Sequence, residues 1–319
     1  MYVLTEHTDF YGLRVDSGME QSIVKLVEEK GPLTGGEILD QVRQLNLLLW
    51  RTCCLSNRMQ RRILGSRYLR LDQQVDGYAR LSPSILREFM TYTVVGLPEA
   101  EQALDQRADQ ITQHIREVSQ SKFALAHSIV AGIERQFASR WPKEGRICFI
   151  LAGDIVYDMA HDVPRPEVST GELVNGSDID LVVVADDTLS NGFLKELDGG
   201  IYQEKYRTLI SPSVREEIDY VVKKMERVRE QLHFDTFKRM VACKILLEGV
   251  LLLGSRSLFE EIKTLLAESG VVQKLGEMER KARIFRERAE EYLLHTELTR
   301  ISKEDLHLFY TSEESEEFE

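Results

Sequence analysis

The stretch of sequence that decides the fold is Gly176-Ser177-Asp178-Ile179-Asp180-Leu181-Val182-Val183-Val184-Ala185. The run from Ser177 to Ala185 predicts a buried β-strand, because a short apolar, β-branched run after turn residues is typical of a strand covered on both faces. Successive strand residues point to opposite faces, so Asp178 and Asp180 should share one face while Ile179 enters the core. A buried strand that opens with two acids on one face calls for a chemical explanation.

Two carboxylates on one strand face indicate a site for a divalent cation. Both cannot stay ionised at low cost unless a cation compensates them. Mg²⁺, with Mn²⁺ as the alternative, prefers such oxygen ligands together with nucleotide phosphates. Two such ions can stabilise the attacking and the leaving oxygen of a phosphoryl or nucleotidyl transfer. The competing structural interpretation is a solvated strand edge or a turn.

Two further strands are predicted around this one. Residues 146–152 (RICFILA) form an apolar run that ends at Gly153, and residues 217–223 (EIDYVVK) form another, with a polar loop expected over 158–176. Asp219 in the third strand is the candidate third carboxylate. Glu217 shares its face and is the rival candidate, and an ion-paired strand residue is the structural alternative.

With these residues, the chain resembles the polymerase-β-like nucleotidyltransferase superfamily, including its minimal members, over about residues 123–253. That family has a Gly-Ser turn after one strand, Asp-x-Asp on the next and a third carboxylate on a later strand. The resemblance implies an α/β (α+β) core with a small mixed sheet. It implies transfer of a nucleoside monophosphate from a nucleoside triphosphate to an acceptor. It also implies that Asp178 and Asp180 hold Mg²⁺ and that Asp219 is the base or completes a metal site.

The chain departs from the family pattern at the turn. Ala152-Gly153-Asp154 stands where Gly-Ser is expected, and an Asp there repels a triphosphate unless a metal ion intervenes. The loop over 158–176 is interpreted as an insertion that serves as a lid or reads the acceptor. Gly-Ser occurs again at 254–255, which we interpret as a turn between two helices. The candidate nucleotide contacts are Gly153, Asp154, Ser177, Lys238 and Lys244, with Arg239 beside them.

The N-terminal part of the chain predicts three short helices followed by a β-hairpin. Thr34 and Glu37 form a capping box at the start of the second helix. Apolar and polar residues alternate on both sides of Asp76-Gly77, which is a hairpin signal. The helices are expected at 18–30, from 34 and at 47–55, and the hairpin strands at 68–71 and 78–81. This order resembles that of a winged-helix domain over about residues 18–95.

A cluster of arginines lies within this N-terminal part. From position 51 to position 80 the chain has seven Arg against two Asp, a local charge of +5. Such a cluster favours contact with the phosphates of a nucleic acid. A solvated face and a protein-docking module are the alternatives. The candidate nucleic-acid contacts are Arg51, Arg58, Arg61, Arg62, Arg67 and Arg70.

The patterns predict four parts in the chain. These are a winged-helix domain over 1–96, a connecting helix over 97–122, a nucleotidyltransferase core over 123–235 and a helical region over 236–319. A further helix is expected over 123–137, within the core. The C-terminal helices are expected over 234–252, 257–268 and 271–295. The acidic tail over 313–319 is expected to be solvated.

Composition limits the class of protein. The chain has 319 residues and a net charge of −12, and no apolar run approaches the length of a membrane span. The first residues lack a signal-peptide pattern, and the 4 Cys form no C-x-x-C pair, as expected for reduced thiols in the cytoplasm. The expected partners are a nucleoside triphosphate and a nucleic acid at the winged helix, without a membrane; an oligomer is compatible with the sequence.

A second function of another class fits the same residues. The chain could be a winged-helix DNA-binding regulator or an antitoxin-like protein with a decayed, non-catalytic nucleotidyltransferase domain. Asp154 in place of Ser and the basic N-terminal segment favour this alternative. The presence of both Asp178 and Asp180 favours the enzyme.

Overall fold

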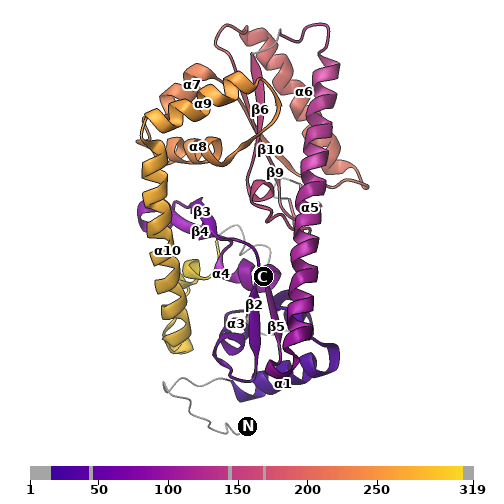
Figure 1. The fold of residues 1–319 in the computed structure, drawn as a ribbon, viewed down its shortest axis with the longest axis vertical. Helices are drawn as coiled ribbons and strands as arrows, with labels where there is room; N and C mark the ends of the chain where they lie inside the picture. The colour runs from indigo at the N-terminus through magenta and orange to yellow at the C-terminus, as the bar shows by residue number, and fades with distance from the viewer. Residues whose placement is uncertain (1–15, 43–45, 143–145, 168–169, 312–319) are drawn as a thin grey trace. The chain divides into compact units, whose positions relative to one another are not determined.

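The fold is that of a computed structural model, which describes residues 16–42, 46–142, 146–167 and 170–311 (Figure 1). The acidic tail expected over 313–319 lies outside the described residues. The chain forms two compact units, the first made of Met1–His114 and Glu279–Glu319 and the second of Ile115–Met278. Among the described residues, no helix has an apolar stretch of the length that crossing a bilayer requires.

The second unit is built on a four-stranded mixed sheet. Its strands are β6 (Ile147–Ala152), β9 (Ile179–Ala185), β10 (Ile218–Lys224) and β11 (Val250–Gly254). They lie in the order β10-β9-β6-β11, with β10 parallel to β9 and the other two pairs antiparallel. The expectation of a mixed α/β fold with a small mixed sheet is confirmed at this level.

Strand alternation gives the sheet an apolar face and a face that carries acids. Ile179, Leu181 and Val183 enter a core that also contains Phe149. This core includes residues of α5 (Glu101–Gln136) and α6 (Asn191–Ile210). Asp180 alternates with Ile179 and therefore points to the other face. The remaining helices of the unit are α7 (Met225–Gln231), α8 (Phe237–Glu248), α9 (Arg256–Glu268) and the start of α10 (Val271–His295).

Several expected element boundaries in the second unit were wrong. Strand β9 begins at Ile179 rather than Ser177, because Gly176 has a φ of +62° and Ser177 N–H donates to the His161 carbonyl at 3.0 Å. The loop expected over 158–176 contains a hairpin. Its strands are β7 (Pro164–Pro166) and β8 (Leu173–Asn175), with the short helix η3 (Asp154–Tyr157) before them.

The predicted end of the helix over 234–252 was also wrong. Helix α8 stops at Glu248, and β11 follows and pairs with β6. A Cβ on Gly249 would lie 2.4 Å from Ile150 Cγ2, so the chain must pass β6 here without a side chain. Gly254 therefore ends a strand, and the Ser255 hydroxyl caps α9 by accepting from Leu258 N–H at 3.1 Å. Gly254-Ser255 is not a turn between two helices.

A single helix replaces the two that were expected over 97–122 and 123–137. Helix α5 runs without interruption from Glu101 to Gln136. The residues where a break was expected contain no Gly or Pro, so nothing in the sequence ends the helix there.

The first unit confirms the expected local elements. Thr34 N–H donates to Glu37 Oε2 at 2.8 Å and Glu37 N–H donates to Thr34 Oγ1 at 3.2 Å, which is the predicted capping box. The hairpin strands pair as predicted. A sheet in the order β1-β5-β2 and helix α4 were not predicted. The elements are α1 (Ser17–Lys30), β1 (Leu33–Thr34), α2 (Gly35–Val42), α3 (Asn46–Leu55), β2 (Gln60–Ile63), β3 (Tyr68–Leu71), β4 (Ala79–Ser82), α4 (Ile85–Tyr92) and β5 (Thr93–Gly96).

A buried ion pair ties α5 to the segment before β10 in the second unit. Lys122 pairs with Glu216, and its ammonium also donates to the Asn175 carbonyl at 2.6 Å. Burial lowers the pKa of Lys122 and raises the pKa of Glu216, while each partner opposes the shift of the other. Each charge is therefore tolerated mainly because the other is present.

Replacing Lys122 with Met should lower the free energy of unfolding of the second unit by about 3 kcal/mol or more, because Glu216 is left buried without a counter-charge. Urea unfolding followed by Trp141 fluorescence in a Trp50→Phe background measures this unit. The exposed pair Arg256–Glu260 gives the control, and Arg256→Met should change the value by less than about 0.5 kcal/mol. The double variant Lys122→Met/Glu216→Leu should recover much of the loss; an equally unstable double variant contradicts the explanation.

Candidate functional site

Asp180 lies at the centre of an acidic group on one face of the sheet. In the strand register it stands opposite Ala152 of β6 and Asp219 of β10. Burial and the neighbouring carboxylates of Asp154, Asp219 and Glu248 together raise the pKa of Asp180 to about 7, while Lys244 opposes this rise. The fold therefore places other carboxylates around Asp180, whose own carboxylate is already poorly solvated.

Gly153 brings the turn after β6 against the Asp180 carboxylate. Its φ is +75°, and a Cβ at this position would lie 2.1 Å from Asp180 Oδ2. Asp154 begins η3 directly after it, and its Oδ2 accepts from the Ser177 hydroxyl at 3.0 Å. Ser177 Oγ in turn accepts from His161 N–H at 3.1 Å. Three of the predicted nucleotide contacts, at positions 153, 154 and 177, are thus brought together.

Glu248 belongs to this group and was missed by the sequence analysis. Its carboxylate accepts from Tyr157 OH at 2.7 Å and from Gly153 N–H at 3.4 Å, and it forms an ion pair with Lys244. The Lys244 ammonium also lies 5.6 Å from the centre of the Tyr157 ring. The i,i+4 spacing of Lys244 and Glu248 was visible, but only the strand that follows α8 reveals that this helix end faces the turn.

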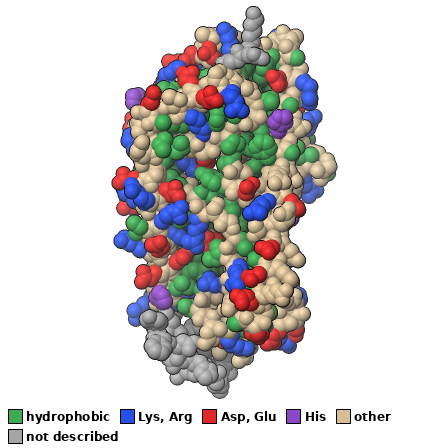
Figure 2. Space-filling model, viewed as in Figure 1, with side chains coloured by type: hydrophobic (Ala, Val, Ile, Leu, Met, Phe, Trp, Pro, Cys, Tyr) green, Lys and Arg blue, Asp and Glu red, His purple; other side chains and the backbone are tan. Residues whose placement is uncertain are grey.

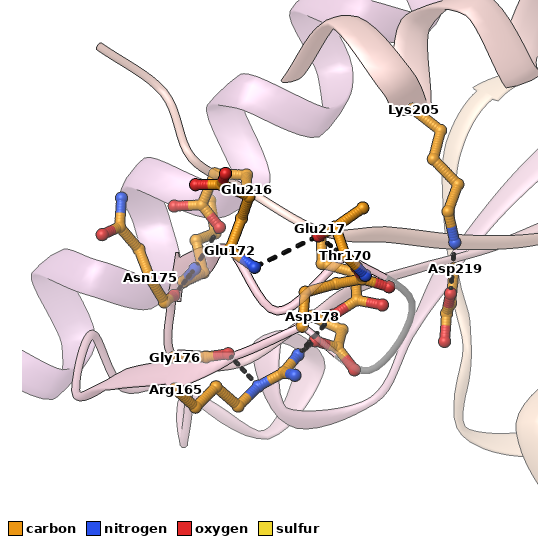
Figure 3. Close-up of polar contacts among 12 residues, drawn as sticks. Arg165, Thr170, Glu172, Asn175, Gly176, Asp178, Lys205, Glu216, Glu217 and Asp219 are labelled. Carbon is orange, nitrogen blue, oxygen red and sulfur yellow. Dashed lines mark hydrogen bonds and ion pairs between the residues drawn. The ribbon is translucent and has the colours of Figure 1, made fainter. Parts of the chain in front are cut away.

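Asp178 precedes β9 and is paired with a basic side chain of the inserted hairpin. Arg165 of β7 forms an ion pair with Asp178, and its Nη2 lies 2.9 Å from Glu217 Oε2 (Figure 3). Arg165 Nε donates to the Gly176 carbonyl at 2.9 Å. Glu217, the rival third carboxylate, also precedes its strand and serves as a partner of Arg165.

Asp219 is the most exposed of the predicted acids. Its side chain is 55% exposed, and Lys205 of α6 donates to its Oδ1 at 2.8 Å (Figure 3). In the parallel register Asp219 lies beside Asp180.

The three basic residues predicted on α8 have different surroundings. Lys244 lies close enough to Asp180 to oppose the rise of its pKa. Arg239 pairs with Asp235 at 2.8 Å, and Lys238 is exposed. The structure therefore brings only Lys244 of this set into the acidic group.

Most of the arginines predicted to contact nucleic acid form contacts within the first unit. Arg51 is buried and donates to the Thr296 carbonyl at 2.5 Å, and Arg67 forms a bidentate pair with Glu88. Acidic and basic side chains are interspersed on the face drawn in Figure 2. Of the others, Arg62 pairs with Glu101 and Asp105, Arg61 donates to Cys54, Arg70 is half-buried and Arg58 is exposed.

The acidic group fits a divalent cation in chemistry. Its donors are hard carboxylate oxygens, and the lack of a side chain at Gly153 lets the Asp180 carboxylate lie directly against the turn. Within the described ranges, no three His, Cys, Asp or Glu side chains converge closely enough to hold a metal ion. Asp178 and Asp219 instead contact Arg165 and Lys205.

No protein-family model and no curated protein matches the chain. Two solved structures resemble half of it. A crystal structure of a toxin-antitoxin with AMP-PNP is 21% identical, covers 50% of this chain and 94% of its own and has a TM-score of 0.25. A crystal structure of a mutant MntA-HpeT toxin-antitoxin is 18% identical, with the same coverages and TM-score. A likeness of this size identifies no family, and the function proposed below is based on the chain's own residues.

The raised pKa of Asp180 should make the second unit less stable as pH rises. Between about pH 4 and pH 7 the folded state keeps a proton that the unfolded chain has released, so the free energy of unfolding falls as pH rises through this window. Asp180→Asn should remove the decline and stabilise the unit at pH 8 by on the order of 2 kcal/mol. Urea unfolding at several pH values with a chelator measures this. The exposed Glu277→Gln should keep the wild-type slope, and an unchanged slope in Asp180→Asn contradicts the assignment.

Gly153→Ala should cost about 3 kcal/mol of stability, because it combines a left-handed backbone with a collision against Asp180. Gly171 is the matched control, since its φ is +71° and nothing lies within 4 Å of its added Cβ. Gly171→Ala should therefore cost only about 1 kcal/mol. Equal losses measured in urea would show that the approach to Asp180 is not tight.

Proposed function

We propose that this chain is a metal-dependent nucleotidyltransferase, which moves a nucleoside monophosphate from a nucleoside triphosphate to an acceptor and releases pyrophosphate. The observation that carries the proposal is the group of carboxylates around Asp180 on one sheet face, supplied by the turn after β6, by β10 and by the end of α8. A strongly perturbed carboxyl group with other carboxylates gathered around it from several elements is typical of sites that bind cations or move protons.

Each residue then has a separate task. Asp178 and Asp180 would hold Mg²⁺ or Mn²⁺, which when bound would neutralise charge on the phosphate oxygens and on the leaving pyrophosphate. Asp219 is exposed beside Asp180, so it would accept the proton of the acceptor hydroxyl. Gly153 would let its backbone approach the phosphates, since no side chain intervenes.

The nucleotide would be oriented by groups that already meet at the turn. Ser177 holds the Asp154 carboxylate in a defined position through its hydroxyl. A bound metal ion would offset the repulsion between this carboxylate and the phosphates. Lys244 would add a positive charge near the phosphates, and Lys238, which is exposed on the same helix and lies outside the acidic group, would add a second contact. An RNA end, a protein or a small molecule could serve as the acceptor, because the carboxylates would bind the metal and phosphates and would not select the acceptor.

The second candidate function is a regulator or antitoxin-like protein whose nucleotidyltransferase-type domain no longer reacts. The ion pairs Arg165–Asp178 and Lys205–Asp219 favour it, because they supply the charge compensation that a metal ion would otherwise give. DNA contact by the first unit would then depend on its exposed basic residues, of which Arg58 is one. A strong salt dependence of DNA binding, reduced in Arg58→Ala, would support this candidate.

Calorimetric titration with ATP, CTP, GTP and UTP in the presence of Mg²⁺ tests the two functions. Wild type should bind at least one nucleotide, and Asp178→Ala/Asp180→Ala should lose that binding, because the metal-bound phosphates lose their ligands. Asp186→Ala/Asp187→Ala removes the same number of acids just beyond β9 and should keep it. Absence of binding to folded wild type, or equal binding by the double variant, contradicts the enzyme.

A further inference from the structure

Arg165 is held in place independently of Asp178. Its Nε donates to the Gly176 carbonyl at 2.9 Å and its Nη2 lies 2.9 Å from Glu217 Oε2. The Arg165 side chain is 13% exposed and that of Glu217 is 11% exposed, so this pair is poorly hydrated and its attraction is stronger than on the surface. The guanidinium therefore has two partners besides Asp178.

The pair Lys205–Asp219 gives a useful contrast. Lys205 is 26% exposed, and its ammonium donates to an acid that is 55% exposed. An exposed pair of this kind contributes about 0–1 kcal/mol and exchanges readily with solvent or ions. Arg165, with two anchors besides Asp178, is the stronger obstacle to another cation (Figure 3).

We propose that Arg165 is a built-in counter-ion that occupies the cation position at Asp178, so that a divalent metal ion must displace its guanidinium from this carboxylate. The inference rests on the proposed function, which makes Asp178 a metal ligand. The displaced guanidinium keeps Glu217 and the Gly176 carbonyl as partners, so the exchange does not leave it buried without a charge. The inserted hairpin thereby sets how tightly the site holds metal.

Binding of Mn²⁺ alone, without nucleotide, tests the competition. Calorimetry and the electron paramagnetic resonance signal of free Mn²⁺ give the affinity for wild type, Arg165→Gln, Arg165→Lys and the control Lys205→Gln. Arg165→Gln should bind Mn²⁺ at least about tenfold more tightly, because a competing charge is gone. Lys205→Gln should change the affinity by less than about threefold. Arg165→Lys should fall between, because an ammonium cannot span three oxygen partners as a planar fork does.

Circular dichroism establishes which variants fold, and Arg165→Lys keeps the test decisive if Arg165→Gln does not fold. Unchanged or weaker Mn²⁺ binding in the folded Arg165 variants overturns the inference and makes Arg165 a positioning residue for Asp178. Failure of this inference is distinguished from failure of the proposed function by measuring Mn²⁺ binding with Asp178→Ala/Asp180→Ala, in wild type and in the Arg165 variant. If Mn²⁺ still binds after both acids are replaced, Asp178 and Asp180 do not form the metal site and the proposed function fails. If Mn²⁺ binding needs both acids but is not tightened in the Arg165 variants, only the counter-ion role of Arg165 fails.

Discussion

The close approach of Gly153 to the Asp180 carboxylate is the contact on which the second unit depends. It fixes the turn after β6 to β9, with 2.1 Å between an added Cβ and Asp180 Oδ2. The parallel register then sets Asp219 beside the same carboxylate. An acid confined in this way is poorly hydrated, and neighbouring acids make its ionised form costlier still. The remainder of the site consists of groups that either crowd this charge or compensate it.

Compensation is divided unequally among the acids. Asp178 and Asp219 each contact a basic side chain, and Glu248 is shared among an ammonium, a phenol and a backbone amide. Asp180 lies against the turn, and Lys244 opposes the rise of its pKa without preventing it. In the enzyme, a metal ion would replace basic side chains as the partner of these acids. In the regulator, the basic side chains would remain their partners. The chemistry of the acids is the same in both.

Sequence patterns predicted the elements that depend on interactions between residues close together in the chain. The capping box, the hairpin around Asp76-Gly77 and the three apolar strands followed from spacing and residue type, and the core position of Ile179 followed from alternation. The strand β11 was missed because its apolar residues fit a helix equally well until Gly249 is seen to pass Ile150. Arg165, Lys205 and Glu248 were missed as site residues because their roles depend on contacts between distant segments, which no spacing in one sequence reveals.

Near neutral pH the Asp180 carboxyl is divided between its protonated and ionised forms. Any cation that binds the ionised form must expel a proton, so protons and cations compete at this position. A fall of one pH unit can then weaken such binding by up to about tenfold, the limit for exchange of a single proton. Through one side chain pressed against a glycine, the chain is made sensitive to the acidity of its surroundings.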